Sequence, residues 1–323
     1  MDPAAAFSRI PGALVGSARR HLRSQTAVSQ FEGLAAHLKT SDTNLALEAD
    51  VLSRIQECKT PGARPVRLLK YEPSDNVLIT EYVAGNSLFN ELWNATSIPA
   101  YFSFRRRSCH GLVIESASWL RGFHAATGLR LDPPAATRAL DWVMTTAEQR
   151  MVAIRTSRRP VLSDADLQAI GAFMRRQFDA ADRDRVQVCG IHGDYCPTNM
   201  IVDDTSAVVV LDFADTRTGL ALEDVARLWS SIWEMGHCGI VRAHVFRSVL
   251  PAIVSAASAT LDEPAFRLLR AWNAVTRIHQ YATVGHKLPY STRQILKRLA
   301  AVNVQWLVRP DDGTIAVTSH VGH

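Results

Sequence analysis

The chain contains 323 residues, of which 47% are hydrophobic and 21% are charged, and it carries a formal net charge of +5. This length is sufficient for two lobes with a sizeable core, and we find neither an apolar run long enough to span a membrane nor the apolar core of a secretory signal. The five cysteines are scattered without a C-x-x-C pair, which favours free thiols in the cytoplasm over a disulfide or zinc framework. The arginines are spread along the chain without a nucleic-acid motif, so nucleic acid is not expected as a partner.

The first informative segment predicts a strand followed by a helix. Residues 34–39 form a short strand candidate that ends in Lys39, and Ser41 with Asp42 offers side chains suited to a helix N-cap. Glu48 lies on nearly the same face of that helix as the apolar residues that recur at helical spacing, which are Leu45, Ala49, Leu52 and Ile55. An ion pair between Lys39 and Glu48 is one interpretation, and a solvated lysine with a surface glutamate is the other.

Two further N-terminal features stay open. A strand is predicted at 77–83, after a turn at 73–76, but by itself this pattern would fit any α/β protein. No segment is assigned to cover a phosphate group. Residues 11–16 contain glycines but lie far before the predicted strand at 34–39, and residues 24–29 contain small hydroxyl side chains but no glycine.

The later part of the chain is predicted to be mainly helical, with a catalytic loop between two groups of helices. The polar tail after Pro310 is expected to fray. The helix candidates are 108–126, 133–185 with breaks near Pro160 and at Ser163-Asp164, 223–235, 241–257, 263–284 and 292–308.

The most informative segment is 191–199, in which His192, Asp194 and Asn199 follow the spacing H-x-D-x-x-x-x-N. A loop rich in Gly, Pro and Asn could be a simple surface turn. A loop held between buried strands is, however, where rigid catalytic groups tend to lie. The last of the surrounding strands is followed by Asp212, and the strand candidates are 186–189, 200–202 and 207–211.

This order of side chains fits phosphoryl transfer from a nucleotide. A γ-phosphoryl group carries dispersed negative charge, so the protein mainly supplies positioning and cations. Asp194 would take the proton of the acceptor hydroxyl, and Asn199 with Asp212 would offer the hard oxygen ligands that Mg²⁺ prefers. His192 belongs to the same catalytic loop and is expected to brace it by hydrogen bonds. A nucleophilic role for Cys196 is not needed to explain the loop.

The motif H-G-D-x-x-x-x-N at 192–199, followed by L-D-F at 211–213, resembles the aminoglycoside phosphotransferase and choline kinase group, which has a protein-kinase-like fold. Gly193, where protein kinases carry arginine, points to the small-molecule kinases of this group. The segment 223–228 also resembles the start of the family's next helix. The resemblance is strong from 186 to 233 and weaker over the rest of the chain.

The resemblance implies an α+β, bilobal fold, with a small β-rich N-lobe at 1–84 and a larger, mainly helical C-lobe at 85–323. It implies ATP and Mg²⁺ as cofactors, with Lys39, held by Glu48, against the α- and β-phosphates. Asp224 would hold the backbone of the catalytic loop, and it would also be favourable simply as a carboxylate at a helix start. The linker expected to bind the adenine edge consists of Glu81, Tyr82 and Val83.

The acceptor is expected to be a small molecule with a hydroxyl group, and the sequence leaves its class and the oligomeric state open. The segment from Arg217 to the end contains 12 Arg and Lys residues but only 7 Asp and Glu residues. This excess of positive charge argues mildly against a polycationic aminoglycoside and suits a neutral or anionic acceptor. Asp215 could face the acceptor or cap a turn. A catalytically silent nucleotide-binding scaffold is a further alternative. A choline or amino-alcohol kinase is another alternative, and it would require an aromatic cage. The candidates for such a cage are Trp229, Trp233 and Trp272. Tryptophans at helical spacing are, however, more often part of the core.

Overall fold

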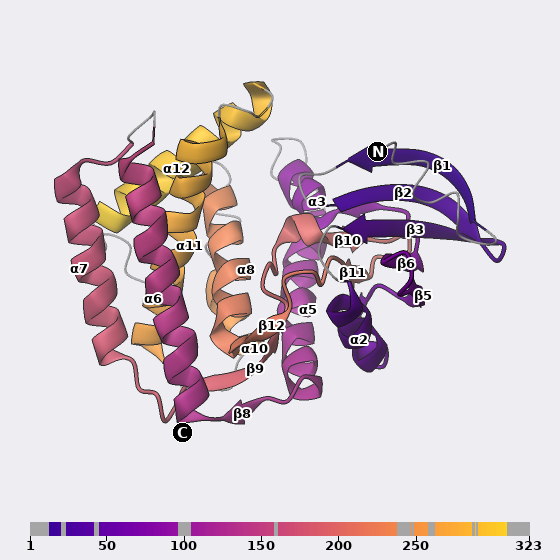
Figure 1. Cartoon of the computed structure of the whole chain (residues 1–323), viewed down its shortest axis with the longest axis horizontal. Coiled ribbons are helices and arrows are strands. Elements are labelled where there is room, and N and C mark those ends of the chain that lie inside the picture. Colours follow the sequence, from indigo (N-terminus) through magenta and orange to yellow (C-terminus); the bar gives the residue numbers. More distant parts are fainter. Residues whose placement is uncertain are drawn as a thin grey trace.

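Strands dominate the N-terminal part of the chain and long helices the C-terminal part, which confirms the predicted α+β arrangement (Figure 1). In Figure 1 the N-terminal sheet lies at the right and the later helices lie at the left. The computed structural model describes residues 13–20, 24–41, 45–95, 105–157, 161–237, 246, 249–257, 262–285, 288 and 290–308.

The N-terminal sheet is antiparallel, with strand order β1-β2-β3-β6-β5. The two segments considered for covering a phosphate group lie within its first strands, because 13–16 belongs to β1 and 24–29 to β2. Residues 21–23, which join these strands, and residues 11 and 12 lie outside the described residues. The strands are β1 (Ala13–Arg20), β2 (Ser24–Phe31), β3 (Leu34–Ser41), β5 (Leu68–Glu72) and β6 (Val77–Glu81).

Side-chain alternation gives this sheet two different faces. Leu38 and Ile79 are cross-strand partners and belong to a small apolar cluster on one face. Their neighbours Lys39 and Leu78 are also cross-strand partners, but they line a cavity on the other face. Because successive residues of a strand point to opposite sides, this register puts Lys39 on the face where a ligand could bind.

Helix α2 (Ala46–Ile55) has the predicted buried face, but the predicted N-cap is wrong. Its N-cap residue is Leu45, which makes no side-chain capping bond. Ser41 cannot cap the helix because β3 continues through it, and Asp42 lies outside the described residues. Asn76 joins the two elements instead: its Nδ2 donates to the Ser41 carbonyl at 2.8 Å, and its Oδ1 accepts the Leu45 N–H at 2.9 Å.

Two smaller sheets position the catalytic loop, and both predicted strands beside the loop are confirmed as β9 and β10. One sheet has the order β4-β11-β10-β7 and the other β12-β9-β8. Strand β4 comes from the N-terminal part yet pairs in parallel with β11, so the predicted division at 84/85 is bridged by main-chain hydrogen bonds. The bounds are β4 (Ala63–Pro65), β7 (Asn86–Ser87), β8 (Arg130–Leu131), β9 (Gln187–Ile191), β10 (Met200–Val202), β11 (Val208–Val210) and β12 (Arg217–Leu220).

The helices largely follow the predicted ranges. The predicted break at Ser163 is real, because Ser163 and Asp166 form a capping box at the start of α7. Of the predicted helix at 241–257, the structure shows α10, because residues 241–245 lie outside the described residues. The tail after Pro310 lies outside them as well. The helices are α3 (Leu88–Ala95), α5 (Arg105–Ala126), α6 (Pro133–Arg155), α7 (Asp164–Ala180), α8 (Ala221–His237), α10 (Leu250–Ala257), α11 (Glu263–Val284) and α12 (Tyr290–Val308).

The main apolar core lies among these helices and extends to α2 and β11, so one body of packed side chains supports both the sheet and the catalytic loop. Within the described ranges, none of the helices combines the length and apolarity that a membrane span needs.

Candidate active site

The loop after β9 carries Asp194, and its shape requires glycine at position 193. Gly193 has a φ of 85°, and a Cβ atom there would lie 2.3 Å from the carbonyl oxygen of Asp215. Any other residue would therefore combine an unfavourable left-handed backbone with a clash against main chain. The glycine lets the chain turn sharply just before Asp194.

Asp224, at the start of α8, holds the backbone of this loop. Its carboxylate accepts the N–H of His192 at 2.9 Å and that of Gly193 at 3.0 Å, and it bonds to His124 Nε2 of α5 at 3.0 Å. Burial of this side chain, which is 1% exposed, would raise its pKa. The hydrogen bonds and charges of His124 and His192 outweigh burial and hold the pKa of Asp224 below its usual value.

His192 and Tyr195 fix the loop from inside the protein. His192 is fully buried; its Nε2 donates to the Leu211 carbonyl at 2.9 Å and its Nδ1 accepts the Asp194 N–H at 3.3 Å. Both ring nitrogens are thus used, which favours bracing over proton transfer. The Tyr195 hydroxyl donates to the Ser116 carbonyl of α5 at 2.7 Å.

The Asp194 carboxylate is held by Arg227 and Asn199. Arg227 Nε and Nη2 donate to Oδ1 at 2.9 and 2.8 Å, and Asn199 Nδ2 donates to Oδ2 at 3.0 Å. Burial opposes ionisation of this group, but the charge and hydrogen bonds of Arg227 outweigh it, so the pKa of Asp194 lies below its usual value. Asp194 is therefore a carboxylate at neutral pH, with its orientation fixed by charge-assisted bonds.

Lys39 joins β3, α2 and the segment after β11. Its Nζ lies 2.9 Å from Glu48 Oε2 and 2.6 Å from Asp212 Oδ1. Burial would lower the pKa of Lys39, but the two carboxylates outweigh it and raise the pKa. The sequence left open whether Lys39 and Glu48 form an ion pair or are both solvated, and in the structure they form the ion pair.

Asp212 and Asn199 are the two polar side chains expected at a metal site, and both line the same cavity. Asp212 adopts a φ of 60°, in the left-handed region that Asp tolerates better than most residues. Its carboxylate is 52% exposed. Asn199 uses its amide nitrogen for the Asp194 carbonyl and carboxylate, which leaves its amide oxygen available as a ligand. The described residues include no group of three His, Cys, Asp or Glu that could hold a metal ion by themselves.

The cavity has a volume of about 430 Å³ and lies between the N-terminal sheet and the catalytic loop. Glu81, Tyr82 and Val83 line it, as do Lys39 and Asp212. Two of the linker amides already have acceptors: the Glu81 N–H bonds to the Arg67 carbonyl at 2.9 Å, and the Tyr82 N–H bonds to the Ala35 carbonyl at 3.0 Å. The Val83 N–H has no protein acceptor among the described residues, so it remains for a ligand.

Two other candidates from the sequence lie near the loop. Asp215 is exposed, two residues beyond the buried Phe213. The Cys196 thiol is buried 3.6 Å from Asp194 Oδ1, and burial together with that carboxylate raises its pKa. A thiol kept protonated is a poor nucleophile, which agrees with the interpretation of Cys196 as a structural residue.

The three candidate cage tryptophans do not form one cage. Trp229 and Trp233 pack with Trp306 around the guanidinium of Arg270, at 4.1, 4.5 and 3.9 Å from the ring centroids. Trp272 instead contacts Trp142 of α6, with ring centroids 5.5 Å apart. The first group is thus filled by a cation of the chain itself.

Sequence reasoning missed Arg227 as a partner of the catalytic loop. A signal was present, because Arg227 follows Asp224 by three residues and therefore lies on the same face of α8 as the residue that holds the loop. His124 gave no comparable signal. It is 100 residues from Asp224 in sequence, and their contact depends on how α5 and α8 pack.

Comparison with known proteins agrees with this geometry. The model of the phosphotransferase enzyme family matches residues 6–257. The chain belongs to this family. No curated protein is significantly similar to this family member in sequence.

Solved structures show the fold of this phosphotransferase-family chain. A thermostable mutant of aminoglycoside phosphotransferase APH(4)-Ia, in a complex with ADP and hygromycin B, is 13% identical with a TM-score of 0.60, and the match covers 96% of this chain and 97% of that one. A choline/ethanolamine kinase family protein from Mesorhizobium loti is 13% identical with a TM-score of 0.58, covering 95% and 94%. An aminoglycoside phosphotransferase from Alicyclobacillus acidocaldarius is 16% identical with a TM-score of 0.50, covering 95% and 94%. These likenesses confirm the predicted protein-kinase-like fold.

Proposed function

We propose that the protein transfers the γ-phosphoryl group of ATP to a hydroxyl group of a small molecule, in a reaction that requires Mg²⁺. The observation that carries the proposal is the position of Lys39, which bonds to both Glu48 and Asp212 at the edge of a cavity that Asn199 also lines. A half-buried cation held by two carboxylates is the arrangement needed to orient nucleotide phosphates. Solved neighbours with ADP or AMP-PNP bound are consistent with a nucleotide in this cavity.

The adenine ring would lie against the linker of Glu81, Tyr82 and Val83. The Val83 N–H is a donor without a protein acceptor among the described residues, and Val83 lines a cavity of a size suited to a nucleotide base and sugar. The phosphates would then extend toward Lys39. Residues 1–84 and 85–323 would act as the two lobes, with β4 tying the first to the second.

Asp212 and Asn199 fit the role of magnesium ligands. Mg²⁺ is usually bound through one or two carboxylates together with substrate phosphates and water, rather than by a complete set of protein ligands. One carboxylate and one amide oxygen beside Lys39 meet that requirement. When bound, the ion would neutralise the charge that develops on the phosphate oxygens.

The transfer itself would take place at Asp194. The acceptor hydroxyl oxygen forms the new bond to the γ-phosphorus, while the bond from that phosphorus to the bridging oxygen breaks and ADP leaves. The hydroxyl proton passes to Asp194. Because Arg227 and Asn199 fix both carboxylate oxygens, the main contribution of Asp194 is to orient the hydroxyl.

A cytoplasmic location is consistent with this reaction and with the free thiols of the described cysteines, which are Cys58, Cys109, Cys189 and Cys196. The alternative of a catalytically silent scaffold is disfavoured because Asp194, Asn199 and Asp212 all keep a geometry that a scaffold does not need. A choline-type acceptor is disfavoured because Arg270 fills the cage of Trp229, Trp233 and Trp306.

The test is acceptor-dependent nucleotide consumption, with and without Mg²⁺, across aminoglycosides, macrolides, sugars, choline and homoserine. Asp194→Asn should lower turnover by about 10²- to 10⁴-fold and leave nucleotide binding intact, whereas Asp75→Asn, at an exposed turn, should change neither. Turnover that survives Asp194→Asn would overturn the assignment. Nucleotide binding without turnover on any acceptor would favour the silent scaffold.

A further inference from the structure

Three arginines from three helices are linked to the catalytic loop through contacts between these helices. Arg227 of α8 bonds directly to Asp194. Arg277 of α11 lies close enough to Cys196 to oppose the rise in the pKa of that thiol. Arg150 of α6 is half-buried and donates to Thr276, the neighbour of Arg277 on α11. Burial, and after it the charge of Arg227, lowers the pKa of Arg150. The three guanidinium groups therefore form a cluster that the ion pair of Arg277 with Glu234 of α8 and the bond of Arg227 connect to Asp194.

Two of these cations are neutralised within the protein. Arg227 is paired with Asp194 at 2.8 Å, and Arg277 is paired with Glu234 at 3.1 Å. Arg150 has no such partner: in the part of the chain that the structure describes, no carboxylate forms an ion pair with it. The cluster thus keeps one positive charge in excess.

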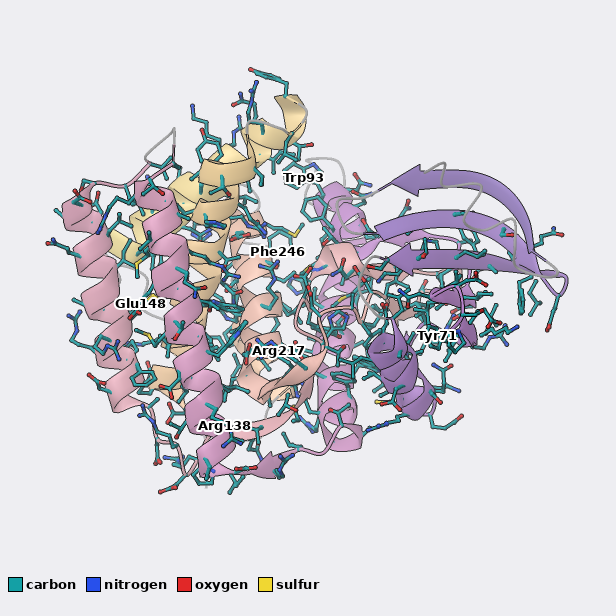
Figure 2. All side chains as sticks on the ribbon, in the orientation of Figure 1. Tyr71, Trp93, Arg138, Glu148, Arg217 and Phe246 are labelled. Carbon is teal, nitrogen blue, oxygen red and sulfur yellow. The ribbon has the colours of Figure 1, made fainter. Side chains whose placement is uncertain are left out.

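Neutral groups hold Arg150 in place. Its Nη1 donates to Thr276 Oγ1 at 2.5 Å, and its guanidinium lies 5.0 Å from the ring centroid of Trp272. Both contacts come from α11 and orient the side chain without removing its charge. Figure 2 shows Glu148, two residues earlier, on the side of α6 that faces α7, where it pairs with Arg175 at 3.2 Å. Arg150 therefore projects from a different side of α6 than the surface ion pair does.

A half-buried arginine that is held by neutral groups and is not neutralised by a carboxylate is a favourable position for binding an anion. We propose that Arg150 binds an oxyanion group, a carboxylate or a phosphate, of the acceptor whose hydroxyl lies against Asp194. This inference rests on the proposed phosphotransfer, and it names the acceptor class as hydroxylated small anions. A polycationic acceptor would be repelled by the same excess charge.

The test uses acceptors that share one carbon skeleton and differ in charge: glycerol, glycerate, glycerol 3-phosphate and 3-amino-1,2-propanediol, with glucose, gluconate, glucose 6-phosphate and glucosamine as a second set. Among acceptors that are turned over, the anionic member should have the lowest KM. Arg150→Gln should raise that KM by about 10- to 100-fold and change the KM of the neutral member little. The matched control is Arg138→Gln, since Arg138 is an exposed arginine at the other end of α6 (Figure 2).

Binding is measured separately, so that this inference does not depend on finding turnover. With the nucleotide site saturated by ADP, calorimetry should give a Kd for glycerate or glycerol 3-phosphate that weakens about 10- to 100-fold in Arg150→Gln and recovers in part in Arg150→Lys. Equal Kd values in the wild type and Arg150→Gln would overturn the inference. A KM for the neutral or cationic members that is lower than the KM for the anionic member would also overturn the inference. That result would leave the proposed phosphotransfer intact. Absence of turnover on every acceptor would count against the proposed function, while the binding result would still decide the role of Arg150.

Discussion

The proposed nucleotide side and the proposed acceptor side of the site are built in different ways. On the nucleotide side, Lys39 and Glu48 come from a strand and the helix that follows it, and Asp212 closes the network at 2.6 Å. On the acceptor side, Arg150, Arg227 and Arg277 come from three helices that are far apart in the sequence. The nucleotide side therefore has a short-range sequence pattern, whereas the acceptor side exists only once the helices have packed.

The charge balance of the two sides also differs. Lys39 faces two carboxylates, so that side carries an excess of negative charge that Mg²⁺ would offset. On the proposed acceptor side, Arg150 has no carboxylate partner among the residues that the structure describes, whereas Arg227 and Arg277 each have one. The loop that carries Asp194 is anchored by Asp224, which accepts the N–H groups of His192 and Gly193. If this division is correct, substitutions on each side should affect different kinetic constants.

The largest expected effect is on the nucleotide side. Lys39→Met should lower kcat by about 10²- to 10³-fold, because it removes the cation that orients the phosphates, and it should leave the acceptor KM nearly unchanged. Steady-state kinetics with each substrate varied in turn would measure both. Lys70→Met, at an exposed lysine of β5, is the matched control. A rise in the acceptor KM as large as that expected for Arg150→Gln would contradict the separation of the two sides.

The next largest effect concerns the anchor that both sides share. Asp224→Asn should lower the free energy of unfolding by about 3 kcal/mol at pH 7, because it removes a buried charge that accepts three hydrogen bonds. Urea unfolding would measure it, with Asp179→Asn at the exposed end of α7 as control. The folded pKa of Asp224 is below its usual value, so its stabilisation is complete above the unfolded pKa of about 3.9 and is lost as the pH falls through the folded pKa. A wild type and variant that differ equally at pH 7 and at pH 3 would contradict this account.

The smallest expected effect is a shift of the pH dependence that Arg227 imposes through Asp194. Arg227 holds the pKa of Asp194 below its usual value against burial, so Arg227→Gln should raise that pKa. Since Asp194 must be ionised, the acid limb of the pH–rate profile should move to higher pH. Arg227→Lys keeps the charge and should move it less. An acid limb that is the same in Arg227→Gln and the wild type would show that another group controls it.

The sequence predicts the features that depend on local geometry better than those that depend on the packing of distant helices. The H-x-D-x-x-x-x-N spacing and the strand that ends in Lys39 predict where Asp194, Asn199 and Lys39 lie on their elements, because each position depends on local geometry. Their catalytic roles stay predictions. The predicted N-cap of α2 is wrong because β3 continues through Ser41, and the Leu45 N–H is bonded instead by Asn76, from a distant turn. The tryptophan cage could not be evaluated from spacing, since only packing brings Arg270 into its centre.

The most direct measurement is the transfer of labelled γ-phosphoryl from ATP to glycerate or gluconate, followed by isolation of the product. We expect a phosphorylated acceptor that is formed by the wild type and the Arg138→Gln control, is reduced at low acceptor concentration in Arg150→Gln, and is lost in Asp194→Asn. Label that stays in ATP with every anionic acceptor while a neutral or cationic acceptor becomes phosphorylated would contradict the assignment of the acceptor side.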